Sequence, residues 1–285
     1  MKLSRHETTG LKTQQTVLVV GASGFLGRCI VDRLSPQTNV ICTHCAHPYF
    51  PTSHRYDFFC DDIQELLETT EVSIVIFAAM VEMSPPEEVR RAMTHFIQEC
   101  HDRRLIYLSS DGIFDGEQGN YTEQDMTIPR TRYGKNLLTC ETLIKEQCRD
   151  YCIIRPSYIY GFSCGELDKR LSRTRERIDA DETVEIFDDM YKSPLGVEQV
   201  AEAVITFSFS KYLGTVHVAG ERLSAFEFHQ QAMRALGIDT ANLKRGAMPI
   251  QPGFLRDTSL DSTLWQTLTG MQPLTVPETL RQSEK

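Results

Sequence analysis

The chain has 285 residues, of which 41% are hydrophobic and 24% charged, a composition typical of a soluble globular protein. Its net charge of -9 argues against nucleic acid or an anionic membrane as the main partner. Its longest apolar run, residues 72–81, is far shorter than the roughly 20 residues of a membrane-spanning helix.

The first 15 residues are polar and charged and lack the apolar core of a signal peptide, so we interpret them as a disordered leader. The nine cysteines are scattered over the chain, which favours reduced thiols and a cytoplasmic location over a disulfide framework. Residues 42–45, Cys-Thr-His-Cys, look like half a zinc site, but no second C-x-x-C or H-x-x-x-H accompanies them. We therefore predict no metal site.

A strand, a glycine turn and a helix are predicted in this order over residues 16–34. Gly21, Gly24 and Gly27 permit, in turn, a tight turn, close approach of the backbone to a pyrophosphate, and close packing of helix on sheet. The positive end of the helix dipole then faces the phosphates. The pattern predicts dinucleotide binding, with a purely structural turn as the alternative. The predicted contacts are Gly21, Ser23, Gly24, Phe25, Leu26, Gly27 and Arg28.

A second strand is predicted over residues 39–45. An acidic residue at the end of this strand commonly binds the adenosine ribose hydroxyls and favours NAD. Residues 43–47 contain no carboxylate. Cationic or titratable side chains are available instead for a 2′-phosphate, although each histidine is equally well explained as a solvated loop residue. They are Arg28, His44, His47 and Arg55. The sequence therefore favours NADP, with NAD possible.

Residues 56–60 predict a third strand that ends at Asp61. A carboxylate there is placed to accept a hydrogen bond from an adenine amino group, or to cap the predicted helix 63–68. The next strand, 72–77, is continuously apolar and ends in Ala78 and Ala79, small residues that let a backbone lie beside a cofactor.

Strands and helices continue to alternate: helix 87–100, strand 105–108, helix 133–148 and strand 152–155. This alternation predicts an α/β fold with a doubly wound parallel sheet. Ligands of such sheets bind at the carboxyl ends of the strands, which directs attention to the residues that follow each strand. They include Ser109, Ser110, Pro156 and Ser157. Later elements are predicted as helix 165–178, strand 184–187, helix 197–209, strand 215–218 and helix 224–236.

Six segments in this order resemble the extended short-chain dehydrogenase/reductases, and among them the dTDP-4-dehydrorhamnose reductases. The segments are 21–27, 109–116, 133–141, 155–161, 189–195 and 257–261. The resemblance spans about residues 15–280. It implies a Rossmann domain over residues 16–160 and a smaller substrate-binding lobe over 161–285, with segments near 188–220 returning to the Rossmann domain.

The resemblance also implies a reaction: transfer of hydride from a nicotinamide to C4 of a nucleotide-linked 4-keto-6-deoxy sugar. Ser110 would hydrogen-bond the substrate carbonyl and Tyr133 would donate the proton. A carbonyl that accepts hydride develops negative charge, so donors must point at its oxygen. Cofactor contacts are expected at Asp61, Ala78, Ala79, Ser109, Pro156 and Ser157, in addition to the glycine turn.

The chain departs from the family pattern at the active-site lysine, which lies four residues after the tyrosine. Leu137 occupies that position, and Lys135 points to roughly the opposite side of the helix. Loss of this assistance is expected to slow turnover by about 10²–10⁴-fold. Gly112, Phe77 and the pair Phe254-Leu255 are further departures.

These features are compatible with two alternative functions. The first is an NAD(P)-dependent reductase of a nucleotide-sugar or related carbonyl substrate, favoured by Ser110, Tyr133 and the glycine turn. The second is a catalytically impaired cofactor-binding subunit, regulatory or scaffolding, resembling the β subunit of methionine adenosyltransferase, and Leu137 favours it. A homodimer and a complex with a partner protein both stay open.

Overall fold

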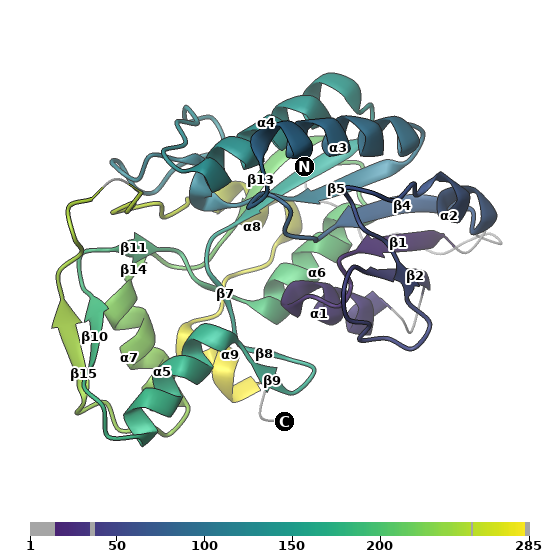
Figure 1. Cartoon of the computed structure of the whole chain (residues 1–285). Coiled ribbons are helices and arrows are strands. Elements are labelled where there is room, and N and C mark those ends of the chain that lie inside the picture. Colours follow the sequence, from purple (N-terminus) through teal and green to yellow (C-terminus); the bar gives the residue numbers. More distant parts are fainter. Residues whose placement is uncertain (1–14, 35–37, 252, 283–285) are drawn as a thin grey trace.

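The computed structural model describes residues 15–34, 38–251 and 253–282. At its centre is a seven-stranded sheet of order β13-β6-β5-β4-β1-β2-β3, in which every neighbouring pair is parallel (Figure 1). Its strands are β1 (Thr16–Val20), β2 (Asn39–His44), β3 (His54–Arg55), β4 (Val72–Phe77), β5 (Arg104–Leu108), β6 (Tyr151–Pro156) and β13 (Gly214–Val218). The predicted doubly wound parallel sheet is thereby confirmed.

Helices cover both faces of this sheet, which explains why its strands are apolar on both sides. Leu18 and Val20 pack into one core cluster, and Val17 and Val19 pack into the cluster on the other face. The first cluster is closed by α2 (Gln64–Thr69), α3 (Pro86–Glu99) and α4 (Arg132–Gln147), and the second by α1 (Phe25–Leu34), α6 (Val197–Ser208) and α8 (Thr263–Thr269).

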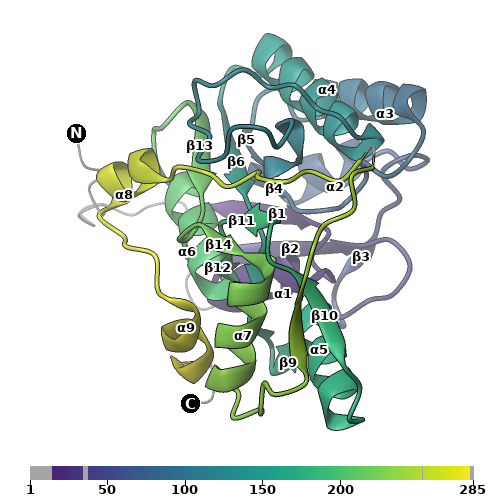
Figure 2. The ribbon, with the colours of Figure 1, turned by 90° about the vertical axis from the view of Figure 1, so that its left-hand side faces the viewer.

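The remaining elements form a smaller assembly beside the carboxyl edge of the sheet (Figure 2). Its strand pairs are β7 (Ile159–Tyr160) with β12 (Leu195–Gly196), β8 (Phe162–Ser163) with β9 (Glu166–Leu167), β10 (Val184–Phe187) with β15 (Leu243–Gly246), and β11 (Tyr191–Lys192) with β14 (Leu223–Ser224). Helices α5 (Lys169–Asp179), α7 (Ala225–Ala235) and α9 (Val276–Gln282) share a small apolar core. Helix α7 lies between α9 and the β10–β15 pair (Figure 2).

The predicted third strand over residues 56–60 is wrong, because β3 is the pair His54–Arg55 and the following segment turns. Carboxylates hold the turn: Asp57 accepts the Phe59 N–H at 3.0 Å, and Asp61 accepts the Asp57 N–H at 2.7 Å. Of the aromatic side chains that suggested a strand, Tyr56 and Phe58 are buried and Phe59 is partly buried.

The predicted helix 165–178 begins later than expected, at Lys169, because Asp168 caps it by accepting the N–H groups of Arg170 and Leu171. Strand β15 and helices α8 and α9 were not predicted. The predicted leader lies outside the described residues except for Gln15. Within the described ranges, no helix combines the length and apolarity needed to cross a membrane.

Candidate active site

The glycine turn between β1 and α1 is packed too tightly for side chains at its first and third glycines. Gly21 has φ of +83°, and a Cβ on it would lie 2.7 Å from the backbone N of Ala79. A Cβ on Gly27 would lie 2.2 Å from the carbonyl oxygen of Gly21. Ala78 donates its N–H to the carbonyl of Val20 at 2.9 Å. The structure therefore brings the predicted contacts Ala78 and Ala79 against the turn.

Arg28, at the start of α1, is held by a neighbour from the smaller assembly. Its Nη1 contacts Glu166 Oε2 of β9 at 2.7 Å, and its guanidinium lies 4.7 Å from the centre of the Tyr49 ring. Its Nε is buried and has no hydrogen-bond partner in the described part of the chain. Arg28 thus stays the predicted ligand of a 2′-phosphate. Glu166 would compete with that phosphate for the Arg28 guanidinium.

Three other residues predicted near the adenosine, His44, Arg55 and Asp61, have local partners. His44 Nδ1 lies 2.8 Å from Ser53 Oγ. Asp61 accepts hydrogen bonds from the Asp57 N–H and from Arg55. The capping role considered for this stretch belongs to its neighbour Asp62, whose Oδ1 accepts the Gln64 N–H at 2.7 Å. A contact of Asp61 with adenine stays a prediction.

Ser110 and Tyr133 meet just beyond the end of β5. Ser110 caps the 3₁₀ turn η1 (Asp111–Ile113): its Oγ accepts the Gly112 N–H at 3.2 Å and donates to Asp111 Oδ1 at 2.9 Å. Tyr133 lies in the first turn of α4, where Thr131 caps the helix by accepting the Gly134 N–H. The Tyr133 ring packs on Gly112, because a Cβ there would lie 3.0 Å from Tyr133 Cε1.

The phenol of Tyr133 is protonated at neutral pH. Burial and the carboxylates of Glu82 and Asp111 raise the pKa of Tyr133 to about 12, while a hydrogen bond with Ser110 lowers it. A protonated phenol is the form that donates a proton to a developing oxyanion. Glu82 was missed in the sequence; it is buried, and its Oε1 accepts the hydroxyl of Tyr107 at 2.6 Å.

Helix α4 brings no cation to Tyr133 in place of the family lysine. Leu137 is 1% exposed and belongs to the apolar cluster between sheet and helices. Lys135 is exposed, on the outer side of the helix with Arg90 and Glu146 nearby. The position four residues after Tyr133, where the family has a lysine ammonium, thus holds the apolar side chain of Leu137.

Asp111 is the centre of a hydrogen-bond network that the sequence did not reveal. Its Oδ2 accepts Ser157 Oγ at 2.9 Å, Lys192 Nζ at 2.8 Å and Thr258 Oγ1 at 2.7 Å. Burial opposes its ionisation, but the Lys192 ammonium and the hydroxyl donors hold the pKa of Asp111 below its usual value. Lys192 lies within the resembling segment 189–195, which was the available signal.

Two further predicted residues make hydrogen bonds to buried carboxylates, Ser109 to Glu141 and Ser157 to Asp111. Ser109 donates to Glu141 Oε1 at 2.6 Å, and Glu141 forms a buried ion pair with Arg155 at 2.6 Å. Pro156 ends β6 and leads to Ser157, whose Oγ also accepts the Ser193 N–H at 3.1 Å. Ser109 therefore faces the interior, whereas Ser157 faces the Asp111 carboxylate.

A pocket of about 460 Å³ opens beside this region, between the turn 115–117 and residues 248–251 and 253–256. Phe254 lies in its wall and contacts Phe187 edge to face, with ring centres 6.2 Å apart. The departure from the family pattern at Phe254-Leu255 therefore makes this part of the pocket wall apolar. Two cations elsewhere in the pocket lining, Arg130 and Arg256, form ion pairs with Glu117 and Asp189, respectively.

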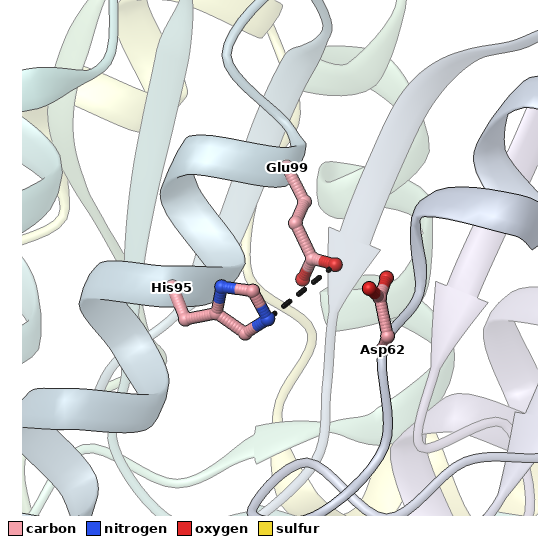
Figure 3. Close-up of side chains that lie close together, drawn as sticks. All are labelled: Asp62, His95 and Glu99. Atoms are coloured by element: carbon pink, nitrogen blue, oxygen red, sulfur yellow. Dashed lines mark ion pairs between the residues drawn. The ribbon is translucent and has the colours of Figure 1, made fainter.

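A second cluster of titratable groups lies away from this site, where Asp62, His95 and Glu99 place their ligand atoms within 4.8 Å of one another (Figure 3). His95 Nε2 is 3.6 Å from Glu99 Oε1, which also accepts the Ile63 N–H at 3.2 Å. Burial and the neighbouring Asp62 raise the pKa of Glu99 to about 7. The two carboxylates together cap the start of α2.

Glu99→Gln is expected to stabilise the protein at pH 8 by about 2 kcal/mol and to change little at pH 4.5. The folded-state pKa of Glu99 is raised, so the unfolded chain ionises first and stability falls as pH rises from about 4.5 to 7. The lowered pKa of Asp62 offsets part of this loss. Urea unfolding at both pH values measures the difference.

Glu88→Gln, an exposed change on the same helix, is the matched control and should show no such pH dependence. A Glu99→Gln variant whose stability relative to wild type is the same at both pH values would contradict the prediction.

Comparison with known proteins places this geometry in context. The model of the RmlD substrate binding domain matches residues 15–282. A probable low-salt glycan biosynthesis reductase of Haloferax volcanii is 28% identical over 249 residues, 81% of this chain and 83% of the relative. The β subunit of methionine adenosyltransferase 2 from Rattus norvegicus is 28% identical over 160 residues, 51% of this chain and 47% of the relative.

Solved structures share the fold over nearly the whole chain. A hypothetical dTDP-4-dehydrorhamnose reductase from Sulfolobus tokodaii superposes with a TM-score of 0.80 at 24% identity, covering 92% of this chain and 98% of its own. The dTDP-4-dehydrorhamnose reductase of Bacillus anthracis, in complex with NADP, superposes with a TM-score of 0.77 at 19% identity, covering 95% and 99%.

Proposed function

The chain belongs to the RmlD substrate binding domain family, and we propose that it is an NAD(P)-dependent reductase of a carbonyl group in a nucleotide-linked sugar. The observation that carries the proposal is the packing of Tyr133 on the turn that Ser110 caps beyond β5, at the edge of the sheet where the glycine turn follows β1. The reductases among the relatives, one of them bound to NADP, support it.

The glycine turn fits a dinucleotide. The first N–H groups of α1 have no partner within the helix, and the close packing at Gly21 and Gly27 leaves the turn without side chains at those positions. A nicotinamide cofactor, when bound, supplies the hydride. The position of Arg28 supports NADP, and NAD remains compatible with the turn itself.

Tyr133 performs the proton transfer in this proposal. Because its raised pKa keeps the phenol protonated, its O–H is available to the carbonyl oxygen as negative charge develops there. Ser110 acts on the phenol in the direction that lowers its pKa and so favours the charge that develops on Tyr133, and Gly112 gives the ring a flat surface to pack on. The substrate oxygen receives the proton of Tyr133, and the phenolate recovers one from solvent.

Purified protein is expected to oxidise NADPH, followed by its absorbance, when a dTDP-4-keto-6-deoxy sugar is added. The control omits the sugar, which separates turnover from slow chemical loss of NADPH. Tight NADPH binding in calorimetry with no oxidation in the presence of the sugar would contradict the reductase proposal for this substrate.

The second candidate is a cofactor-binding regulatory or scaffold subunit, favoured by one observation: the position of the family lysine is filled by the buried side chain of Leu137. The match to the methionine adenosyltransferase subunit supports it over half of the chain. NADPH binding without turnover of any nucleotide-sugar tested would favour this function. We also propose a cytoplasmic location, supported by nine cysteines that are all free and all lie in the described ranges.

A further inference from the structure

The Asp111 carboxylate connects the proposed catalytic pair to a lysine that reaches it from the smaller assembly. Lys192 is on β11, 81 residues away from Asp111 in the sequence, and its Nζ lies 2.8 Å from Asp111 Oδ2 and 2.6 Å from Thr258 Oγ1. The other carboxylate oxygen, Oδ1, accepts the Ser110 hydroxyl. One buried carboxylate therefore separates the Ser110 hydroxyl from an ammonium.

The direction of the hydrogen bonds follows from the single proton of Ser110. This proton is donated to Asp111, and the Gly112 N–H donates to Ser110 Oγ. Ser110 acts on the Tyr133 phenol in the direction that lowers its pKa, so its hydroxyl favours the phenolate when it turns toward it. Ser110, which acts on Tyr133, thus donates to one oxygen of Asp111, and Lys192 donates to the other.

Resting on the proposed reductase function, we propose that Lys192 is a positioning residue that performs, through Asp111 and Ser110, the electrostatic task of the lysine replaced by Leu137. Lys192 neutralises the buried Asp111 charge and keeps its carboxylate oriented toward Ser110.

Tyr133 needs this compensation because it becomes a phenolate after giving up its proton. The charged groups acting on it are the carboxylates of Glu82 and Asp111, which oppose a phenolate, and the guanidinium of Arg170, which favours one. An unpaired negative charge on the buried Asp111 would add directly to this opposition. With Lys192 in place, Ser110 is free to turn its proton from Asp111 to the phenolate.

Two other cations near the site have partners different from Asp111. The Arg170 guanidinium lies over the Tyr158 ring at 4.5 Å, and Arg155 is paired with Glu141. Among the described residues, Lys192 is the cation that forms an ion pair with Asp111. Its side chain is 28% exposed, so the ammonium keeps contact with solvent while it serves a buried partner.

The test compares Lys192→Met with Lys192→Arg and with Lys135→Met. The last variant is the matched control, because it removes an exposed lysine two residues from Tyr133 in the sequence but on the outer side of the helix. Lys192→Met is expected to lower kcat about 10²-fold with little change in KM or in NADPH affinity. Lys192→Arg should retain most of the activity, and Lys135→Met all of it. Adding Asp111→Asn to Lys192→Met should restore about tenfold, because the uncompensated charge is then gone.

A pH profile separates this role from a merely structural one. The groups that face Asp111 are Lys192, Thr258 and Ser110, with Ser157 beside them and Tyr133 beyond. In Lys192→Met the Asp111 carboxylate loses its ammonium, so it protonates nearer to neutral pH and its opposing charge disappears. The kcat of this variant should recover as pH falls toward 5.5, whereas wild-type kcat should not rise there.

The outcomes are distinct. A wild-type enzyme that reduces no nucleotide-linked ketosugar overturns the reductase function and this inference with it. An active wild type with a Lys192→Met variant of equal kcat, or with a loss that neither Asp111→Asn nor lower pH relieves, overturns the inference and leaves the reductase function standing.

Discussion

Replacing Tyr133 with phenylalanine is expected to lower the kcat for NADPH-dependent reduction by about 10³-fold while changing NADPH affinity less than about twofold. The phenyl ring retains its packing on Gly112, so the first turn of α4 keeps its place. What is lost is the O–H that donates to the substrate oxygen. Because this donor acts as charge develops, the loss falls on kcat rather than on binding.

Steady-state kinetics and calorimetry with NADPH measure the two quantities separately. Tyr151→Phe is the matched control, since Tyr151 begins β6 at the opposite end of the strand from Ser157 and should leave both unchanged. A Tyr133→Phe variant with wild-type kcat would show that another group protonates the substrate.

The substitution Gly27→Ala is expected to destabilise the protein by about 3 kcal/mol or more and to abolish measurable NADPH binding. The new Cβ would lie 2.2 Å from the Gly21 carbonyl oxygen and 2.9 Å from the Ala22 Cα, and both obstacles are backbone. Helix α1 must therefore move away from β1, and the N–H groups of its first turn move with it. Thermal unfolding and calorimetry measure the two effects.

Gly24→Ala is the informative comparison, because the same methyl group is added where more space exists. Its Cβ would lie 3.2 Å from the Gly21 carbonyl oxygen, a contact relieved by a small shift. Stability should fall by less than about 1 kcal/mol, while NADPH affinity should fall at least about tenfold because the methyl group occupies the approach of the pyrophosphate. Equal destabilisation by the two substitutions would contradict these separate roles.

The sequence alone predicted the features that depend on neighbours along the chain. Alternating apolar strands and amphipathic helices predicted the parallel sheet, and the spacing of Gly21, Gly24 and Gly27 predicted the turn after β1. The resemblance to the reductase family implied a lysine four residues after Tyr133, on the same helix face, and Leu137 stands at that position and is buried. The failure at residues 56–60 has the same origin, since buried aromatic residues in a turn resemble a strand locally.

The tertiary structure decided which distant groups meet. The resemblance drew attention to segment 189–195, but no local pattern there indicates that the Lys192 ammonium reaches Asp111. This contact joins residues 81 positions apart through the placement of β11 beside residues 256–258. The partner of Arg28 was likewise set by β9, far along the chain. Sequence periodicity reports burial and local backbone geometry, whereas compensation of a buried charge depends on what the folded chain brings within a few ångströms of it.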